Sequence, residues 1–406
     1  MGYTKQAVTG FGWNSLLRVA TMALTLIKIS ILARLLSPED FGLFSLVVIA
    51  LGIAEASTQT GVNVTIIQSK QSIKYFLNSA WVIAISRGFI IGIAMILLGL
   101  LMQRYYTEPR LPLLISFAAL VPIIKGFINP AIVSLRKELR FFRESVYHFS
   151  LVVIEVSAAV AFGLLLNSVW ALIIALVLTA LFEVVISFVF FSPKPRFEYL
   201  SSRGKIILSN ARGLTLSAAL SYVQENVDDL IVGKVTGTHN LGLYHNGYAL
   251  AHKSSYEPAK AVAHSTFPVY TKIASDSDRL QRGFLRSILA TGALIMVTSI
   301  PLLVAPDFFV NLLLGDQWIA VIPLVRWLVA AAVLQSLTVV VYNLFLTKAT
   351  YLWLNFHQIS SVAILVALLF VLPQQYGILG GAWAVFLSRL LSLPILILGT
   401  IRVLKS

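Results

Sequence analysis

Two stretches of the chain carry the same order of apolar helix, tight turn and apolar helix. The first stretch runs from residue 14 to residue 61, with its turn at Ser37-Pro38-Glu39-Asp40. The second runs from residue 214 to residue 261, and it matches the first at a fixed offset of 200 residues. This offset gives six matched pairs: Ile31 with Ile231, Arg34 with Lys234, Asp40 with Asn240, Gly42 with Gly242, Leu43 with Leu243, and Phe44 with Tyr244. The pattern predicts an internal duplication, so that the chain consists of two related halves.

Apolar segments recur along the whole length of the chain. A segment of about 20 apolar residues is long enough to cross the hydrocarbon core of a membrane as a helix. We expect twelve such helices, at about residues 8–36, 40–61, 76–102, 111–133, 145–166, 169–191, 205–234, 240–262, 283–304, 320–346, 350–372 and 378–402. The sequence therefore predicts an all-α polytopic membrane protein with two pseudo-symmetric lobes of six helices. Pro122 and Pro130 are expected to bend the fourth helix, because each removes a backbone donor.

The segment from Ser192 to Arg203 is the Pro-rich and charge-rich break near the middle of the chain. We therefore expect an N-lobe at residues 1–191, a cytoplasmic linker at 192–204 and a C-lobe at 205–406. With six spans in each half, both lobes enter the membrane in the same direction. Their pseudo-twofold axis is then expected to lie along the membrane normal.

The composition agrees with a membrane protein. Hydrophobic residues make up 58% of the chain and charged residues 12%, and the mean hydropathy is +0.86, whereas a soluble domain has about 25% charged residues. The alternating strands of about ten residues that a membrane β-barrel needs are missing. The first apolar run lacks a small-residue cleavage site, so we expect a retained helix rather than a signal peptide. The absence of cysteine excludes disulfides and thiolate metal sites.

The net charge of +14 could suggest nucleic acid as a partner, but most basic residues fall in short loops between apolar spans, so we expect no nucleic-acid binding. If the N-terminus is cytoplasmic, eighteen Lys and Arg residues share its side: Lys5, Lys70, Lys74, Arg136, Lys137, Arg140, Arg143, Lys194, Arg196, Arg203, Lys205, Lys260, Lys272, Arg279, Arg282, Lys348, Arg402 and Lys405. The other side has four: Arg34, Arg104, Arg110 and Lys234. This excess predicts that both termini are cytoplasmic.

Polar residues inside the expected spans indicate a cavity, because an ionisable group in a membrane needs water or a partner. One face of the first helix carries Asn14, Arg18, Thr21, Thr25 and Lys28, in steps of 4, 3, 4 and 3. One face of the seventh carries Ser217, Ser221, Glu225 and Asp228. By the offset, Glu225 matches Thr25 and Asp228 matches Lys28. One lobe is therefore expected to present cations to a shared cavity, and the other carboxylates.

Further charges fall inside other spans, and two interpretations are open for each of them. These residues are Glu55, Arg87, Lys125, Glu155, Glu183, Arg212 and Lys253. Each could face the cavity, or it could reach the headgroups or pair locally. Arg34 and Lys234 are expected to anchor helix ends. Gly42 and Gly242 are expected to allow close helix packing.

Signatures of soluble catalysis are missing, and so is a ligand spacing for metal. The chain contains no GxxxxGK[ST], GxGxxG, GxSxG or HExxH. The six histidines, at 148, 239, 245, 252, 264 and 357, show no metal-ligand spacing. We therefore expect no enzymatic activity, no cofactor and no metal, and any uphill transport would draw on an ion gradient or on metabolic consumption of the substrate.

Several motifs resemble a known family. The run ILARLLSPEDFGLF from Ile31 to Phe44, followed by Thr60-Gly61 and Ile66-Ile67-Gln68, is similar to the start of the polysaccharide transporter (Wzx-type) flippases. So is NVDDLIVGK from Asn226 to Lys234, followed by Leu241-Gly242-Leu243-Tyr244. The resemblance covers nearly the whole chain, and the Ser-Pro-Glu-Asp-Phe-Gly turn is its most specific part. This family belongs to the superfamily of multidrug, oligosaccharidyl-lipid and polysaccharide exporters.

The resemblance implies a V-shaped two-lobed bundle that opens alternately to the two sides of a bacterial or archaeal cytoplasmic membrane. The implied cargo is an oligosaccharide repeat unit on undecaprenyl pyrophosphate, used for surface polysaccharide, and polysaccharide polymerase and export machinery are implied partners beside membrane lipids. A pyrophosphate that leaves water needs Arg or Lys. We therefore expect Arg18 and Lys28 to bind it, with Arg87, Lys125 and Arg212 as second candidates. Glu225 and Asp228 would pair with these cations in the empty state or carry the coupling ion.

Three other functions remain open. A cation-coupled multidrug antiporter of the same superfamily would prefer an acidic, aromatic-lined cavity, which the cations of the first helix do not favour. A membrane glycosyltransferase or polymerase acting on lipid-linked sugars usually needs a large extracytoplasmic loop, and the outward links here are short. A non-transporting scaffold would not need a polar helix face inside the bilayer.

Overall fold

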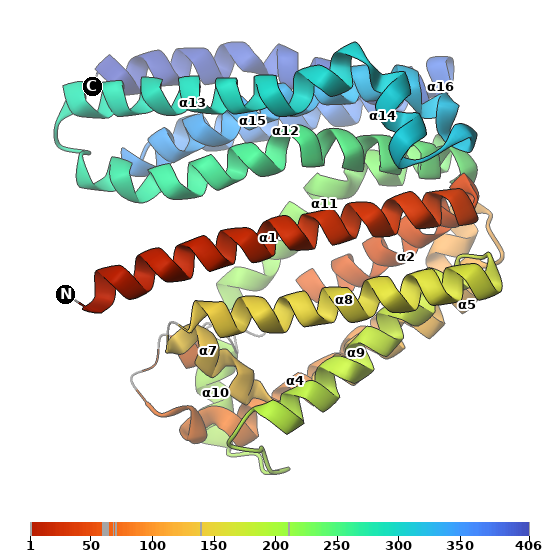
Figure 1. The fold of residues 1–406 in the computed structure, drawn as a ribbon, viewed down its shortest axis with the longest axis vertical. Helices are drawn as coiled ribbons and strands as arrows, with labels where there is room; N and C mark the ends of the chain where they lie inside the picture. Colours follow the sequence, from red (N-terminus) through yellow and green to blue (C-terminus); the bar gives the residue numbers. More distant parts are fainter. Residues whose placement is uncertain are drawn as a thin grey trace. The chain divides into compact units, whose positions relative to one another are not determined.

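The structure is a computed structural model of the 406-residue chain. It describes the backbone of residues 2–58, 65–67, 69, 71–138, 140–209 and 212–405, and the side chains of these residues except 2–16, 18, 209, 212–221 and 405. Every regular element within these ranges is a helix (Figure 1). The chain forms two compact units, Met1–Asn226 and Val227–Ser406. The all-α fold predicted from the sequence is therefore confirmed.

Five long helices build most of the first unit. They are α1 (Gly2–Leu35), α2 (Pro38–Ala56), α4 (Ile73–Tyr106), α8 (Phe141–Leu166) and α9 (Trp170–Phe190). Helix α1 packs along α8, which in turn packs along α9 (Figure 1). Small residues allow these close approaches: a Cβ added to Gly163 of α8 would lie 2.7 Å from Leu32 of α1. Close approach of this kind increases van der Waals packing, which contributes to the association of helices in membranes.

The predicted fourth helix is broken into short pieces. They are α5 (Leu111–Ala118), α6 (Leu120–Gly126), the 3-10 turn η1 (Pro130–Val133) and α7 (Ser134–Lys137). The chain bends by 71° between the piece that ends at Gly126 and the piece that begins at Pro130. Pro130 lacks a backbone donor, and the Asn129 side chain accepts a hydrogen bond from Ala131 N at 3.0 Å instead. A bend at Pro130 agrees with the expectation from the sequence.

The region expected to form the seventh helix contains two helices, α10 (Ser201–Ser209) and α11 (Arg212–Thr236). The division between the two units falls inside α11, after Asn226. The first half of α11 groups with the first unit, since the Tyr222 hydroxyl donates to the Val48 carbonyl of α2 at 3.2 Å. The boundary expected at 192–204 stays a prediction about where the lobes join.

The second unit contains α12 (Thr238–Lys272), α13 (Ser277–Val304), α14 (Pro306–Leu313), the 3-10 turn η2 (Asp316–Val321), α15 (Ile322–Thr347) and α16 (Tyr351–Lys405). Helix α15 packs against α12, α13 and α16. Gly377, with a φ of 56°, has non-helical backbone and divides α16 into two helices. These halves correspond to the expected helices at 350–372 and 378–402. Helix α12 runs ten residues beyond the expected end at 262, and α14 was not expected.

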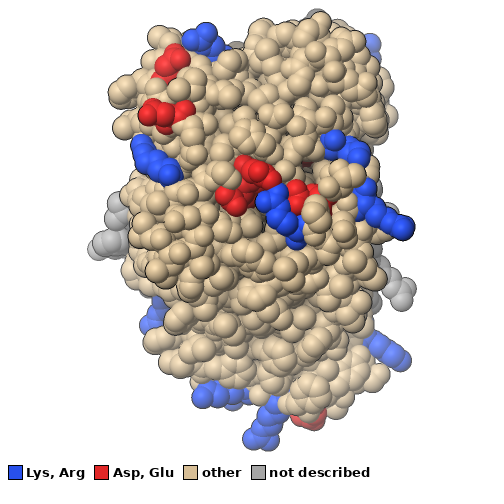
Figure 2. Space-filling view, turned by 90° about the vertical axis from the view of Figure 1, so that its right-hand side faces the viewer, with Lys and Arg blue, Asp and Glu red and all other residues tan. Residues whose placement is uncertain are grey.

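The helices have the length and the apolar character of a membrane protein. Among the described residues, six helices could cross a membrane, and a seventh span is possible if the bent pair Leu111–Gly126 and Pro130–Lys137 is counted as one. Helix α16 counts once in this total, although Gly377 divides it. Charged side chains are sparse on the face shown in Figure 2. The protein is therefore a multi-pass membrane protein, while the number of twelve spans stays a prediction.

Candidate functional site

The polar face of α1 carries an ion pair inside the first unit. Lys28 Nζ lies 2.5 Å from Glu155 Oε1 of α8, and the two side chains are 18% and 28% exposed. Thr21 and Thr25 lie on the same face, and their hydroxyls donate at 2.8 Å to the carbonyls of Leu17 and Thr21. These threonine oxygens can still accept hydrogen bonds. The predicted face therefore holds a cation that is paired within its own unit.

Three of the predicted site residues lie outside the part of the chain whose side chains the structure describes. They are Asn14, Arg18 and Arg212. Their roles in the expected cavity stay predictions. The same holds for Ser217 and Ser221 on the polar face of α11.

The two remaining predicted cations have different surroundings. Arg87 of α4 donates through Nε to the Thr58 carbonyl at 2.6 Å and through Nη2 to the Glu55 carbonyl at 2.9 Å. These carbonyls end helix α2, where a cation is favoured by the helix dipole. Lys125 of α6 is exposed. Arg87 thus holds the C-terminal end of α2, and its role toward a substrate stays a prediction.

Two neighbouring carboxylates of α11 are buried in the second unit. Asp228 accepts a hydrogen bond from the Tyr244 hydroxyl at 2.8 Å, and Asp229 Oδ2 lies 2.7 Å from His245 Nδ1. Both aspartates are at least 94% buried, with exposures of 5% and 6%. Among the described residues, Asp229 Oδ1 is buried and has no hydrogen-bond partner. A buried carboxylate oxygen without a donor is costly, so this position suits a bound proton or a small cation.

Arg389 of α16 belongs to the same group of side chains. Its Nη2 lies 3.2 Å from the Tyr248 hydroxyl, and its charge attracts the Asp228 carboxylate. Within the described part of the chain, its Nη1 is buried and has no partner. Arg389 was not among the residues predicted from the sequence, although it lies inside the apolar segment 378–402. Arg87 and Lys125 were singled out because they are charged residues inside expected spans, and the same is true of Arg389.

Helix α12 carries a column of rings beside these aspartates. Tyr244, Tyr248, His252 and Tyr256 follow one another at spacings of four residues. The ring centroids of successive members are 6.3, 5.5 and 4.4 Å apart. The spacing of four residues is visible in the sequence, since it places side chains on one face of a helix. The exposed Glu225, by contrast, lies on α11 in the first unit.

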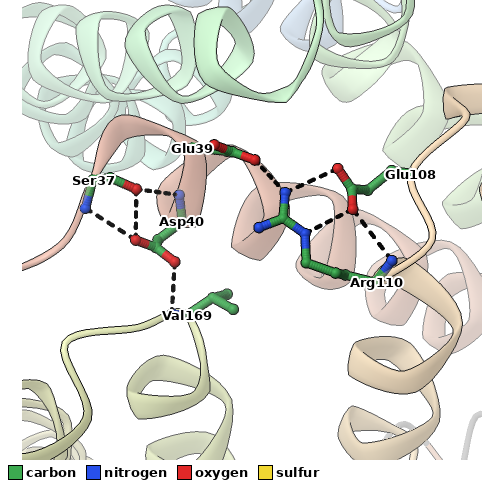
Figure 3. Close-up of polar contacts among 6 residues, drawn as sticks. All are labelled: Ser37, Glu39, Asp40, Glu108, Arg110 and Val169. Atoms are coloured by element: carbon green, nitrogen blue, oxygen red, sulfur yellow. Dashed lines mark hydrogen bonds and ion pairs between the residues drawn. The ribbon is translucent and has the colours of Figure 1, made fainter.

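A second polar cluster lies where α2 begins, and Figure 3 shows its contacts. Ser37 and Asp40 form a reciprocal cap: Ser37 N donates to Asp40 Oδ2 at 3.0 Å, and Asp40 N donates to Ser37 Oγ at 3.2 Å. Asp40 Oδ1 also accepts a hydrogen bond from Val169 N, just before α9, at 2.9 Å. Asp40 therefore ties the starts of two helices together, which explains the Ser-Pro-Glu-Asp turn in physical terms.

Arg110 bridges two carboxylates in the same cluster (Figure 3). Its Nε donates to Glu108 Oε1 at 2.7 Å, and its Nη2 also pairs with Glu39. The side-chain hydrogen bond from Arg110 lowers the pKa of Glu108 below its ordinary value. Arg34, near the end of α1, donates to the Ser30 carbonyl of its own helix at 2.9 Å. This end of the first unit is held by structural contacts, as was expected for Arg34.

Within the part of the chain that the structure describes, no group of three or more His, Asp and Glu side chains could hold a metal ion. The site residues are therefore ionisable and aromatic side chains of apolar helices. Cations and carboxylates occur in both units. Such a set can bind anions, protons or small cations inside a membrane.

Comparisons with solved structures agree with this fold. The chain is similar to the structure titled "Lipid II flippase MurJ, inward closed conformation", with a TM-score of 0.72, 12% identity, and coverage of 97% of this chain and 89% of that chain. It is also similar to an inward-facing multidrug resistance MATE family transporter, with a TM-score of 0.70, 13% identity, and coverage of 95% of each chain. At these identities the likeness establishes the fold alone, a two-lobed all-α membrane fold.

Sequence comparisons show the family. Over 359 residues, the chain is 23% identical to the Lipopolysaccharide biosynthesis protein WzxC of Escherichia coli (strain K12), covering 86% of this chain and 71% of that protein. Over 390 residues, it is 22% identical to the Teichuronic acid biosynthesis protein TuaB of Bacillus subtilis (strain 168), covering 94% and 79%. A sequence model described as "Polysaccharide biosynthesis protein" matches residues 31–323. Since this match spans well over half of the chain, the protein belongs to the family of polysaccharide biosynthesis proteins.

Proposed function

We propose that this protein moves undecaprenyl-pyrophosphate-linked oligosaccharide repeat units from the inner to the outer leaflet of a bacterial cytoplasmic membrane by alternating access. The family match and the relatives named for lipopolysaccharide and teichuronic acid biosynthesis support this proposal. The likeness in fold to a lipid II flippase supports it as well, since lipid II also carries a sugar on a lipid. The protein is then a transporter without catalytic residues of its own.

The observation that carries the proposal is the Lys28–Glu155 pair. Both charges lie within apolar helices, where an unpaired charge costs several kcal/mol. A phosphate oxygen of the cargo can take the place of Glu155 beside Lys28, because both are anionic acceptors. The mostly buried position strengthens this interaction, since water screens it little. Arg18 lies on the same predicted face and would add a second cation.

The buried aspartates fit a coupling site in the second unit. Asp228 and Asp229 are neighbours in sequence and both are buried, so their negative charges repel each other. A proton or a monovalent cation at the unpartnered Asp229 Oδ1 would relieve this repulsion. His245, on the other oxygen of Asp229, is a second side chain that can hold a proton. The coupling role that the sequence suggested for Asp228 thus extends to Asp229.

Both termini are proposed to be cytoplasmic, because the excess of Lys and Arg on one predicted side is large. Polysaccharide polymerase and export machinery are proposed as partners on the outer side. These would consume the delivered repeat units and so draw transport forward.

The test is complementation in bacteria that lack this protein. We expect undecaprenyl-linked oligosaccharide to accumulate in such cells, and the wild-type chain to relieve the accumulation. Lys28→Ala and Arg18→Ala should each reduce flipping about tenfold, which corresponds to about 1.4 kcal/mol of lost interaction. Glu155→Gln is the matched control: it removes the other half of the ion pair and leaves the cation, so it should still complement.

All variants must reach equal levels in the membrane for this comparison. Equal loss in Glu155→Gln and Lys28→Ala would contradict cargo binding by Lys28, since the pair would then act only as a structural contact.

If no lipid-linked sugar accumulates and sensitivity to cationic drugs rises instead, the protein is an antiporter. The paired aspartates beside the aromatic column of α12 are the feature that favours this second candidate.

A further inference from the structure

The linker between α9 and α10 is fixed to the body of the first unit. Arg196 N donates to Asn78 Oδ1 of α4 at 3.0 Å, and Asn78 Nδ2 donates to Glu198 Oε2 at 2.9 Å. Four residues further along the linker, Leu200 N donates to Ser79 Oγ at 3.1 Å. A segment held by successive hydrogen bonds of this kind is a built part of the fold rather than a loose connection.

Further contacts hold both ends of this linker. Asn129 Nδ2 donates to the carbonyls of Phe191 and Pro193, each at 3.2 Å. Arg203 of α10 donates to the Tyr75 carbonyl at 2.9 Å, and its guanidinium lies 4.2 Å from the centre of the Tyr75 ring. Ile207 of α10 is fully buried in a cluster with Phe76 and other apolar residues. Helix α10 is therefore packed by one face and held at its first turn.

The outer face of the same segment is apolar and basic. Phe190 and Phe197 are 75% and 77% exposed, and Ile206 and Leu208 are both 44% exposed. Lys194, Arg196 and Lys205 are exposed between them, against a single carboxylate, Glu198. The fold thus turns large apolar side chains and three positive charges outward and fixes the backbone that carries them.

We propose that residues 190–208 form a membrane-surface anchor that binds the headgroups of anionic phospholipids. This segment comprises the last residue of α9, the linker and most of α10. Aromatic and aliphatic side chains beside Lys and Arg are the chemistry of segments that lie at the interface between headgroups and acyl chains. Each basic residue near an anionic membrane surface contributes about 1 kcal/mol to binding. The position of this segment agrees with a place at the membrane surface. The segment begins at Phe190, the last residue of α9, and α9 is long and apolar enough to cross a membrane.

The anchor has a consequence for transport. It fixes the N-terminal end of α4 and the segment that leads into α11 at one depth in the membrane. This inference goes beyond the proposed function and does not depend on what the protein transports. It predicts that the membrane position of the linker responds to lipid charge.

The chain contains no cysteine, so one fluorescent label can be placed by Phe197→Cys without altering any other residue. The labelled full-length protein is reconstituted into phosphatidylcholine bilayers that contain either brominated phosphatidylcholine or brominated phosphatidylglycerol as quencher. We expect both lipids to quench the label, and phosphatidylglycerol to quench it at a lower mole fraction. This result would show a linker that is immersed in the interface and surrounded by anionic lipid.

The charges are tested by the triple change Lys194→Gln, Arg196→Gln and Lys205→Gln. All three side chains are exposed, and the Arg196 bond to Asn78 uses its backbone, so the fold is expected to persist. The variant should lose the preference for the anionic lipid, so that brominated phosphatidylglycerol quenches the label at the same mole fraction as brominated phosphatidylcholine. Quenching by brominated phosphatidylcholine should remain, because Phe190, Ile206 and Leu208 are present in both labelled proteins.

A control removes three exposed charges elsewhere, by Lys272→Gln, Arg279→Gln and Arg282→Gln. This variant should keep the preference of the parent for phosphatidylglycerol. The proposal is wrong if neither lipid quenches the label, which would place Phe197 in water or against a protein. It is also wrong if the two quenchers act equally on the parent, or if the control loses the preference as the linker variant does.

Discussion

Two cations of the first unit show how the partner of a charge decides its function. Arg87 donates to the backbone carbonyls of Thr58 and Glu55, and a ligand could take this guanidinium only by leaving the end of α2 without donors. Lys28 instead pairs with the Glu155 side chain, which can be exchanged for another anion. Of these two predicted cavity cations, Lys28 is therefore the better candidate for contact with cargo.

Glu108 gives a pH-dependent contribution to the stability of the first unit. Its pKa is lowered, first by the hydrogen bond from Arg110, so the folded chain binds a proton there less readily than the unfolded chain does. The stabilisation is present in full above the ordinary value of about 4.3 and is lost as the pH falls through the lowered value. The exposed Arg110 keeps the size of the effect modest.

We therefore expect the melting temperature of the parent to fall more steeply below about pH 5 than that of Glu108→Gln. The measurement is thermal unfolding in detergent as a function of pH. The two curves should differ most near neutral pH and approach each other in acid. Curves that stay parallel over this range would contradict a stabilising Glu108–Arg110 pair.

At the scale of elements, the sequence predicted the long apolar helices and missed the short helices. Period and length identify α8, α9 and α13, and Pro130 marks a bend that is present. Helix α14 has only eight residues, too few for a clear period. The docking of the linker depends on Asn78 and Glu198, which are 120 residues apart. Contacts over such distances are set by tertiary packing, and no local pattern encodes them.

Asp40 is expected to matter for two helices at once. Asp40→Ala removes the carboxylate that accepts from Ser37 N and from Val169 N, the residue before α9, and leaves the bond from the backbone N of residue 40 to Ser37 Oγ. We expect a loss of about 1–2 kcal/mol in the free energy of unfolding, the range for lost helix caps. Thermal unfolding of the purified chain measures this loss as a lower melting temperature.

Glu39→Gln is the matched control, since it changes the neighbouring carboxylate and leaves the cap in place. It should alter the stability by less than about 1 kcal/mol, as is usual for exposed ion pairs. If both variants unfold at the same temperature, the cap contributes no more than the Arg110 contact does.

At the scale of the whole molecule, charge patterns located part of the candidate site. The periodic polar face of α1 led to Lys28, and the polar face of the seventh expected helix led to Asp228. No pattern in the sequence indicates that Glu155 is the partner of Lys28, because 127 residues separate them. The sequence also did not connect Asp229 with His245 or Asp228 with Tyr244, since these contacts need α11 and α12 to pack together. The sequence pattern thus identifies the charged residues, whereas tertiary packing determines which residues they contact.

The orientation in the membrane is the remaining whole-molecule prediction. The excess of Lys and Arg predicts that the linker and the turn before α13 face the cytoplasm, and that η2 faces the outside. Single cysteines at three exposed positions, Ser202→Cys, Ser275→Cys and Ala320→Cys, can report this in a chain that has no cysteine of its own. In intact cells, a membrane-impermeant thiol reagent should label Cys only in the Ala320→Cys variant. After the membrane is opened, all three variants should react. Labelling of Ser202→Cys or Ser275→Cys in intact cells would reverse the predicted orientation, and the direction of transport proposed for this protein would then have to be reversed with it.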